Sequence, residues 1–139
     1  MKRITALALF TITSLASFSA ATAQEPGLKA KIPFDFTVGN TTLPAGEYTI
    51  MSPTQVVVWI RNTNNASSAA VVSTPSHRDS GSVSELVFLR VGDRYFLHSA
   101  LGGSHSAMNL DIASGKAEKE ARIQEAKLHT RHEVLVAAR

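Results

Sequence analysis

The chain has 139 residues, no cysteine, and 14 basic residues against 11 acidic ones. This length suits a single domain, and a chain without cysteine cannot form disulfides, thiolate metal sites or a thiol nucleophile. Because 44% of the residues are hydrophobic, such a chain can bury one modest core by packing alone.

The first residues predict an export signal. Lys2 and Arg3 precede an uncharged, largely apolar run from Ile4 to Phe18. Ala21-Thr22-Ala23 then offers the small residues that a signal peptidase requires. We therefore predict a signal peptide over residues 1–23, and no later run is long and apolar enough to span a membrane.

The mature chain should begin at Gln24 and form one β-rich domain over residues 24–139, in the periplasm or outside the cell. Mass analysis of the N-terminus of the exported protein measures this directly. A retained Met1 would contradict both the predicted location and the charge balance below.

Loss of the signal changes the net charge. Without Lys2 and Arg3 the chain keeps 12 of the 14 basic residues against 11 acidic ones, a balance of +1. This near neutrality predicts no binding of nucleic acid or of an anionic membrane. The cysteine-free composition of a small exported domain favours a bacterial setting.

The first strand is predicted from Leu28 to Val38 by strict alternation. One face carries Ile32, Phe34, Phe36 and Val38, and the opposite face carries Lys31, Asp35 and Thr37. Pro33 removes one backbone donor, so this strand should lie at a sheet edge or contain a bulge there. We expect the apolar face to be buried and Thr37 to face solvent.

Two turns and two strands follow. Gly39-Asn40 predicts a tight hairpin turn, and residues 44–46, P-A-G, predict another before a strand from Glu47 to Met51. Gln55 to Arg61 is a continuous apolar run, which indicates a central strand covered on both faces. Trp59 is therefore expected in the core rather than on the surface as a platform for sugar stacking.

A second hairpin is predicted after a weaker strand over Ala69 to Thr74. Its strands run from Val83 to Val91 and from Arg94 to Leu101, joined by Gly92-Asp93. A two-residue loop fixes the register, so that the predicted pairs are Val91 with Arg94, Arg90 with Tyr95, Leu89 with Phe96, Phe88 with Leu97, and Val87 with His98.

The C-terminal part combines one helix with short strands. A strand is possible within His105 to Ile112, and residues 116–128 predict a helix with Ser114 as its cap. Glu118 and Arg122 form a favourable pair four residues apart. The tail over residues 133–138 could extend the helix, but its β-branched residues favour a last strand.

These elements predict a mainly β fold. Their spacing indicates a single antiparallel β-sandwich or small barrel of about seven strands, with a C-terminal helix.

Three segments resemble a family of short bacterial secreted proteins that carry signal peptides and have no assigned activity. They are I-P-F-D-F-T-V-G at 32–39, L-P-A-G-E-Y at 43–48 and L-V-F-L-R-V-G-D-R-Y-F-L at 86–97. The resemblance covers most of the chain from Lys29 to Leu101. It implies a compact, mostly antiparallel β domain in an exported protein, and it brings no activity, cofactor or catalytic residue to this chain.

Five histidines raise the question of a metal site: His77, His98, His105, His129 and His132. Only His129 and His132 are closely spaced, and no third ligand stands at a diagnostic distance from them. A catalytic zinc ion usually takes three protein ligands, so we predict that these two histidines bind no metal and that the protein uses no cofactor.

Two further arrangements suggest catalysis only weakly. Ser104 precedes His105, but the surrounding residues lack the G-x-S-x-G turn that exposes a nucleophilic serine. Asp35 and Glu47 flank the first two turns and could approach each other as a carboxylate pair, but the interpretation that we favour is that both are solvated charges on outward faces.

We therefore expect an exported, non-enzymatic binding or structural module of the envelope or extracellular space. Its partner would be a protein or a surface polymer. The alternative is a small secreted hydrolase or metal-dependent enzyme that uses His77 and Asp79 with Ser104 and His105. If a loop faces a ligand, it should be the polar segment from Pro75 to Ser82, since functional groups often sit on loops held by a rigid scaffold.

Overall fold

The computed structural model describes residues 27–78, 81–103, 108–127 and 131–138. Within these residues the chain is mainly β, with ten strands and one helix. The strands are β1 (Leu28–Ile32), β2 (Phe36–Val38), β3 (Thr41–Leu43), β4 (Gly46–Met51), β5 (Val57–Asn62), β6 (Ser68–Pro75), β7 (Glu85–Val91), β8 (Arg94–Leu101), β9 (Asn109–Ile112) and β10 (Arg131–Ala137). The helix α1 (Lys116–Ala126) lies between β9 and β10 in the chain, and no described helix is long and apolar enough to cross a membrane.

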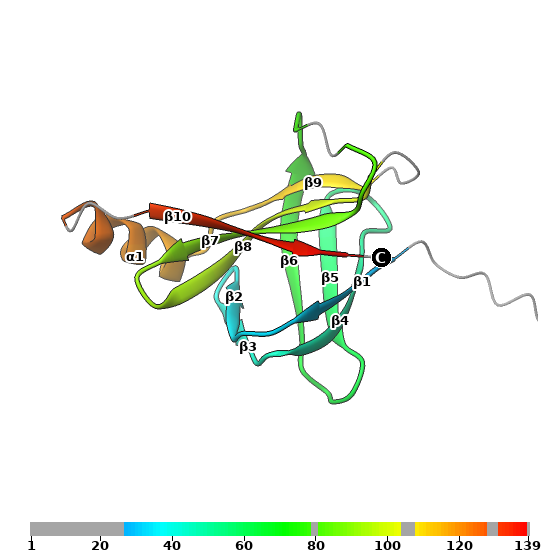
Figure 1. The fold of residues 1–139 in the computed structure, drawn as a ribbon, viewed down its shortest axis with the longest axis horizontal. Helices are drawn as coiled ribbons and strands as arrows, with labels where there is room; N and C mark the ends of the chain where they lie inside the picture. The colour runs from blue at the N-terminus through cyan, green and yellow to red at the C-terminus, as the bar shows by residue number, and fades with distance from the viewer. Residues whose placement is uncertain (1–26, 79–80, 104–107, 128–130, 139) are drawn as a thin grey trace, which may run out of the picture.

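The strands form one continuous sheet in the order β1-β4-β5-β6-β9-β8-β2-β3, with β7 beside β8 and β10 beside β7. All pairs are antiparallel except β2 with β8, so the sheet is mixed. In Figure 1, β5 and β6 run up the picture while β7 to β10 run across it, and the sheet wraps around the main core.

The prediction of a mainly β fold with a helix near the C-terminus is confirmed, but its details are wrong in three respects. The described strands number ten rather than about seven, the sheet is open rather than a closed barrel, and it is mixed rather than antiparallel because β2 pairs with β8 in parallel. The sheet branches at β8. One edge of β8 pairs with β7, and the other edge pairs with β2 and with β9. The residue that follows β10, Ala138, forms an isolated antiparallel bridge with Ala30 of β1.

The predicted first strand is two strands. The chain leaves the sheet at Pro33, and β1 pairs with β4 whereas β2 pairs with β3 and β8. All three residues of β2 are buried, Thr37 among them at 4% exposure. The prediction that Thr37 faces solvent is therefore wrong. The Gly39-Asn40 turn is confirmed by the pairing of Val38 with Thr41 and a φ of 59° at Gly39.

β5 lies inside the sheet between β4 and β6, as predicted, but only one of its faces is buried. Val58 and Ile60 point into the core, whereas Trp59 lies on the outward face and is 49% exposed. The expectation of a core tryptophan is therefore wrong. Buried and exposed positions alternate along β5. The sequence does not reveal this alternation, because the residue at one exposed position, Trp59, is itself apolar.

The β7–β8 hairpin has the predicted register at four pairs, from Val91 with Arg94 to Phe88 with Leu97. The register then shifts, and Val87 pairs with Ser99 rather than with His98. His98 is thus the extra residue of a β-bulge. The flanking residues Leu97 and Ala100 both pack in the main core, so His98 and Ser99 both lie off the core face.

α1 packs against the face of β7 and β8 that is turned away from the main core. A second, smaller core forms there from Leu89, Val91, Phe96 and Ala121. We call this surface of β8, β7 and β10 the outer face. The strand predicted for the tail is confirmed as β10, which pairs with β7 along its whole length.

The start of α1 is fixed by a neighbouring turn rather than by the predicted Ser114 cap. Gly115 occupies the N-cap position, and the Lys116 backbone N–H donates to Asn40 Oδ1 at 2.9 Å. Ser114 instead donates through Oγ to Glu118 Oε1 at 3.1 Å. The β2–β3 turn therefore holds the first residue of the helix in place.

Candidate functional site

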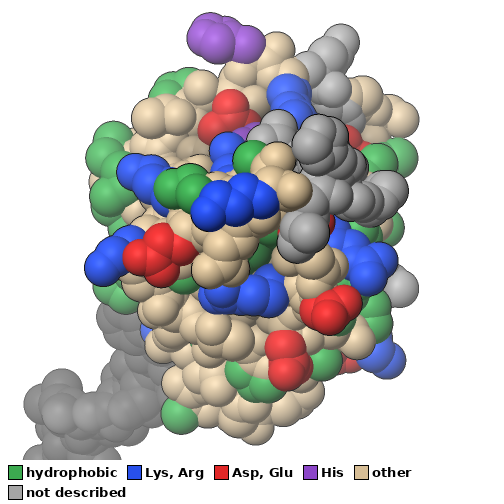
Figure 2. All heavy atoms as spheres, turned by 90° about the vertical axis from the view of Figure 1, so that its left-hand side faces the viewer, with side chains coloured by type: hydrophobic (Ala, Val, Ile, Leu, Met, Phe, Trp, Pro, Cys, Tyr) green, Lys and Arg blue, Asp and Glu red, His purple; other side chains and the backbone are tan. Residues whose placement is uncertain are grey.

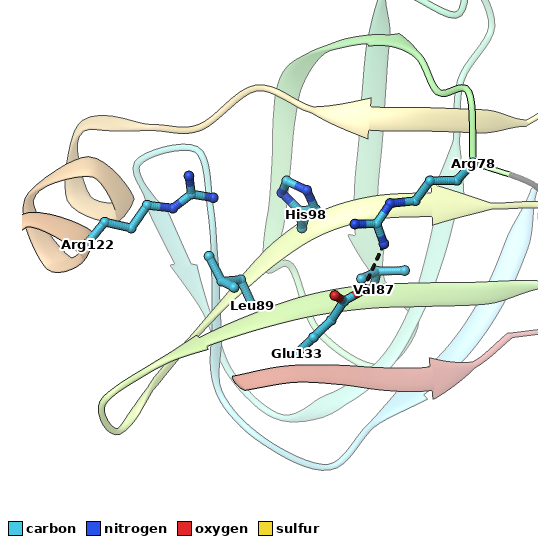
Figure 3. Close-up of a pocket in the computed structure, with 6 residues that line it drawn as sticks. All are labelled: Arg78, Val87, Leu89, His98, Arg122 and Glu133. Carbon is cyan, nitrogen blue, oxygen red and sulfur yellow. Dashed lines mark hydrogen bonds and ion pairs between the residues drawn. The ribbon is translucent and has the colours of Figure 1, made fainter. Parts of the chain in front are cut away.

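A pocket of about 290 Å³ lies on the outer face, between α1 and the segment that follows β6. Five separate parts of the chain supply the lining residues that the structure describes, which are Arg78, Val87, Leu89, His98, Arg122 and Glu133. Figure 3 shows Arg122 and Arg78 reaching toward the centre from opposite sides, with His98 between them.

The floor of the pocket is aliphatic. Val87 and Leu89 stand two residues apart on β7, so both side chains leave the same face of the strand. Glu133 of β10 pairs with Leu89 and therefore stands beside this floor. Val134 and Val136 of β10 pack against the main core. Since side chains alternate along a strand, the carboxylate of Glu133 lies on the outer face.

His98 owes its position to the bulge in β8. Its side chain is partly buried, and its Nδ1 atom is fully buried with no hydrogen-bond partner among the described residues. Ser99, the other residue off the core face, donates through Oγ to Asp111 Oδ1 at 2.7 Å. The bulge thus turns one polar side chain into the pocket and the other toward β9.

Arg122 forms an ion pair with Glu118, which lies one turn earlier on α1. Its guanidinium pairs through one terminal nitrogen with Glu118, which is 4% exposed. The sequence predicted this pair from the four-residue spacing. The Nε atom of Arg122 is buried and has no partner among the described residues. Arg122 therefore presents a fixed donor to which no described residue supplies an acceptor.

Arg78 closes the opposite side. Its Nη1 donates to Glu133 Oε1 at 2.8 Å, and both side chains are more than 40% exposed. This hydrogen bond raises the pKa of Arg78 above its ordinary value, and the negative charges of Glu133, Asp111 and Glu85 act in the same direction against partial burial. Arg78 therefore remains charged at every physiological pH.

A second pocket of about 280 Å³ lies at β1 and β4, lined by Lys29, Ala30, Lys31, Glu47, Tyr48 and Thr63. Within the described part of the chain, the only buried side-chain nitrogen or oxygen atoms without a hydrogen-bond partner are those of His98 and Arg122. Because both line the first pocket, that pocket is the candidate site.

Of the histidine, serine and aspartate residues singled out for catalysis or metal binding, most lie outside the part of the chain that the structure describes. His77 is exposed and lies next to Arg78 without lining the pocket. Asp79, Ser104, His105 and His129 lie outside the described residues, as does the side chain of His132. Among the residues that the structure describes, no group of three or more His, Asp or Glu side chains could hold a metal ion.

The proposed carboxylate pair has a structural explanation on one side. Asp35 Oδ1 accepts a hydrogen bond from the Ala45 backbone N–H at 2.8 Å and so braces the turn between β3 and β4. Glu47 is exposed on β4.

Charged groups at the α1 end of the molecule are mixed in sign. Figure 2 shows Lys and Arg side chains interspersed with Asp and Glu side chains on this face. Two of the ion pairs at this end join Arg90 to Asp93 and Lys116 to Glu120. Such a face provides no continuous basic surface of the kind that tracks a nucleic-acid backbone.

Comparison of the chain with protein-family models, with curated proteins and with solved structures found no match. Function therefore has to be argued from the pocket itself. Of its lining residues, the sequence pointed to Arg78 through the polar loop after β6 and to Arg122 through its pair with Glu118. The sequence did not indicate that these two side chains and His98 line one pocket. The residues of β8 contain no pattern that predicts the β-bulge at His98.

Proposed function

We propose that the protein is an exported, non-enzymatic binding module of the bacterial envelope or extracellular space. It holds a small ligand, or the end group of a surface polymer, in the pocket between α1 and the outer face. The observation that carries this proposal is that His98 and Arg122, each with a buried nitrogen that has no partner among the described residues, line one pocket. A buried polar group without a partner costs about 1–3 kcal/mol, and a ligand that supplies an acceptor offsets that cost.

The framework around the pocket supports binding to a preformed site. The β-bulge fixes His98, the Glu118 ion pair fixes the guanidinium of Arg122, and Asn40 fixes the start of α1. Side chains held in this way lose little conformational freedom when a ligand binds, so more of the contact energy appears as affinity.

The lining groups also favour binding over catalysis. They are two guanidinium groups, an imidazole, a carboxylate and two aliphatic side chains. The carboxylate of Glu133 is engaged with Arg78, and no hydroxyl nucleophile stands among the six lining residues. The hydrolase alternative rested on His77, Asp79, Ser104 and His105, of which only His77 is described, and it lies outside the pocket.

The test is a ligand screen on the mature protein, residues 24–139, by methyl and imidazole NMR. Fragments are grouped as anions, cations and neutral polar compounds. We expect at least one group to shift the signals of Val87, Leu89 and His98 together, because these side chains share one cavity.

A variant with a filled pocket provides the matched comparison. Leu89→Phe places extra volume on the pocket floor and should abolish these shifts. Val72→Phe makes a similar enlargement at an exposed position on β6 and should leave them unchanged. Shifts confined to other parts of the protein, or none with any group of fragments, would overturn the proposed binding site.

A further inference from the structure

We infer that the pocket takes an organic monocarboxylate with a short apolar body. This inference rests on the proposed binding function and adds the chemical class of the ligand. It follows from three properties of the pocket: the direction of its free hydrogen bonds, its charge, and its aliphatic floor.

The buried nitrogen of Arg122 requires an acceptor. Arg122 Nε carries a hydrogen and can only donate, and His98 Nδ1 donates when it carries the proton. A carboxylate offers two acceptor oxygens to such donors, and hydrogen bonds between ionised partners are the stronger kind. A cationic ligand would face the two guanidinium groups and would leave Arg122 Nε without a partner.

The charge of the pocket suits one negative charge rather than two. Apart from His98, the charged residues of the lining that the structure describes are the positive Arg78 and Arg122 and the negative Glu133, a balance of one positive charge. Acidic groups stand directly behind this lining. Glu118 pairs with Arg122, and the charges of Asp111 and Glu85 act on Arg78. A dianion such as a phosphate monoester would therefore bring more negative charge than the site compensates.

The ion pair of Arg78 leaves room for a ligand carboxylate. Arg78 and Glu133 are both substantially exposed, with side chains 43% and 49% accessible, so water competes with their contact. Arg78 can therefore turn part of its five-donor fork toward a ligand without leaving a buried charge unpaired.

The floor selects the rest of the ligand. Val87 and Leu89 line the pocket beside the donors, and since they are 1% and 8% exposed, Leu89 supplies most of the aliphatic surface that a ligand can reach. An acyl chain lying on them should strengthen binding by about fourfold for each methylene that it buries. A cavity of about 290 Å³ accommodates a chain of several carbons.

Three probes with the same six-carbon chain test this class: hexanoate, hexanamide and hexyl phosphate. Each is titrated into the mature protein near neutral pH, with the shifts of Val87, Leu89 and His98 as the readout. We expect hexanoate to bind at least about tenfold more tightly than the other two and acetate to bind much more weakly, because acetate lacks the chain.

Two variants separate the donors from the fold. Arg122→Lys keeps a cation for the buried Glu118 but removes Nε–H, and His98→Leu removes Nδ1. Each should weaken hexanoate binding about tenfold or more. Arg61→Lys changes an exposed arginine on β5, outside the pocket, and should bind like the parent.

The outcomes distinguish the inference from the proposed function. Equal or tighter binding of hexanamide or hexyl phosphate in the pocket would overturn the carboxylate class and leave the binding module intact. Unchanged hexanoate affinity in a folded Arg122→Lys or His98→Leu protein would also overturn it. Failure of every fragment group to shift the pocket signals would overturn both.

Discussion

Replacing Phe36 with alanine should lower the free energy of unfolding by about 3 to 5 kcal/mol, the usual range for a fully buried phenylalanine. Phe36 is 1% exposed, and its ring packs edge-on against Tyr48 and Phe88, with centroids 5.1 and 5.4 Å away. These two rings come from β4 and β7, so the truncation leaves a cavity where distant parts of the sheet meet. Urea denaturation of the mature protein followed by circular dichroism measures the loss.

The neighbouring threonines provide the comparison. Thr41→Ala, at an exposed position in β3, should change the stability by less than about 0.5 kcal/mol. Thr37→Ala should cost about 1–3 kcal/mol, because Thr37 is buried and its Oγ1 lies 3.2 Å from Thr42 Oγ1. Equal effects of Phe36→Ala and Thr41→Ala would mean that β2 does not turn Phe36 into the core.

Gly115→Ala should destabilise the protein by about 3 kcal/mol, at the upper end for added volume in a packed region. A methyl group at Gly115 would overlap the backbone carbonyl of Gly39 in the β2–β3 turn. Because a backbone carbonyl cannot rotate away like a side chain, the start of α1 would have to move. The hydrogen bond from Lys116 to Asn40 would then be lost as well. Urea denaturation measures the effect.

This substitution should also disturb the pocket, because α1 carries Arg122. The His98 and Leu89 signals should shift in the variant even without a ligand. Ala113→Ser, a change of similar size at an exposed position two residues earlier, should leave stability and signals near those of the parent. A Gly115→Ala protein as stable as the parent would contradict the close approach of the helix to the turn.

Local patterns in the sequence were sufficient to predict several elements of the fold. The Gly39-Asn40 turn, the hairpin through Gly92-Asp93 and the C-terminal strand are all confirmed. So is the pairing of Glu118 with Arg122. Each of these features depends on residues that are close in sequence, where turn chemistry and the period of a strand or helix fix the outcome.

Hydrophobicity patterns gave wrong predictions where the same residue types are compatible with either a buried or an exposed position. Trp59 belongs to an apolar run, yet only one face of β5 is covered, and the tryptophan lies on the other. Thr37 follows the alternation of an exposed position, yet β2 is buried at all three residues between β3 and β8. Burial at these positions depends on which strands become neighbours, and the period of a strand does not contain that information.

The sequence by itself determined that this protein is mainly β, where its main hairpins turn, and that Arg122 has an acidic partner. Only the tertiary structure decided that the first predicted strand divides at Pro33 and that His98 is the extra residue of a bulge. It also brought Arg78, His98 and Arg122 around one pocket. These side chains belong to a loop, a strand and a helix far apart in the chain. Their meeting depends on long-range packing of the helix and the loop onto the sheet, which no local spacing encodes.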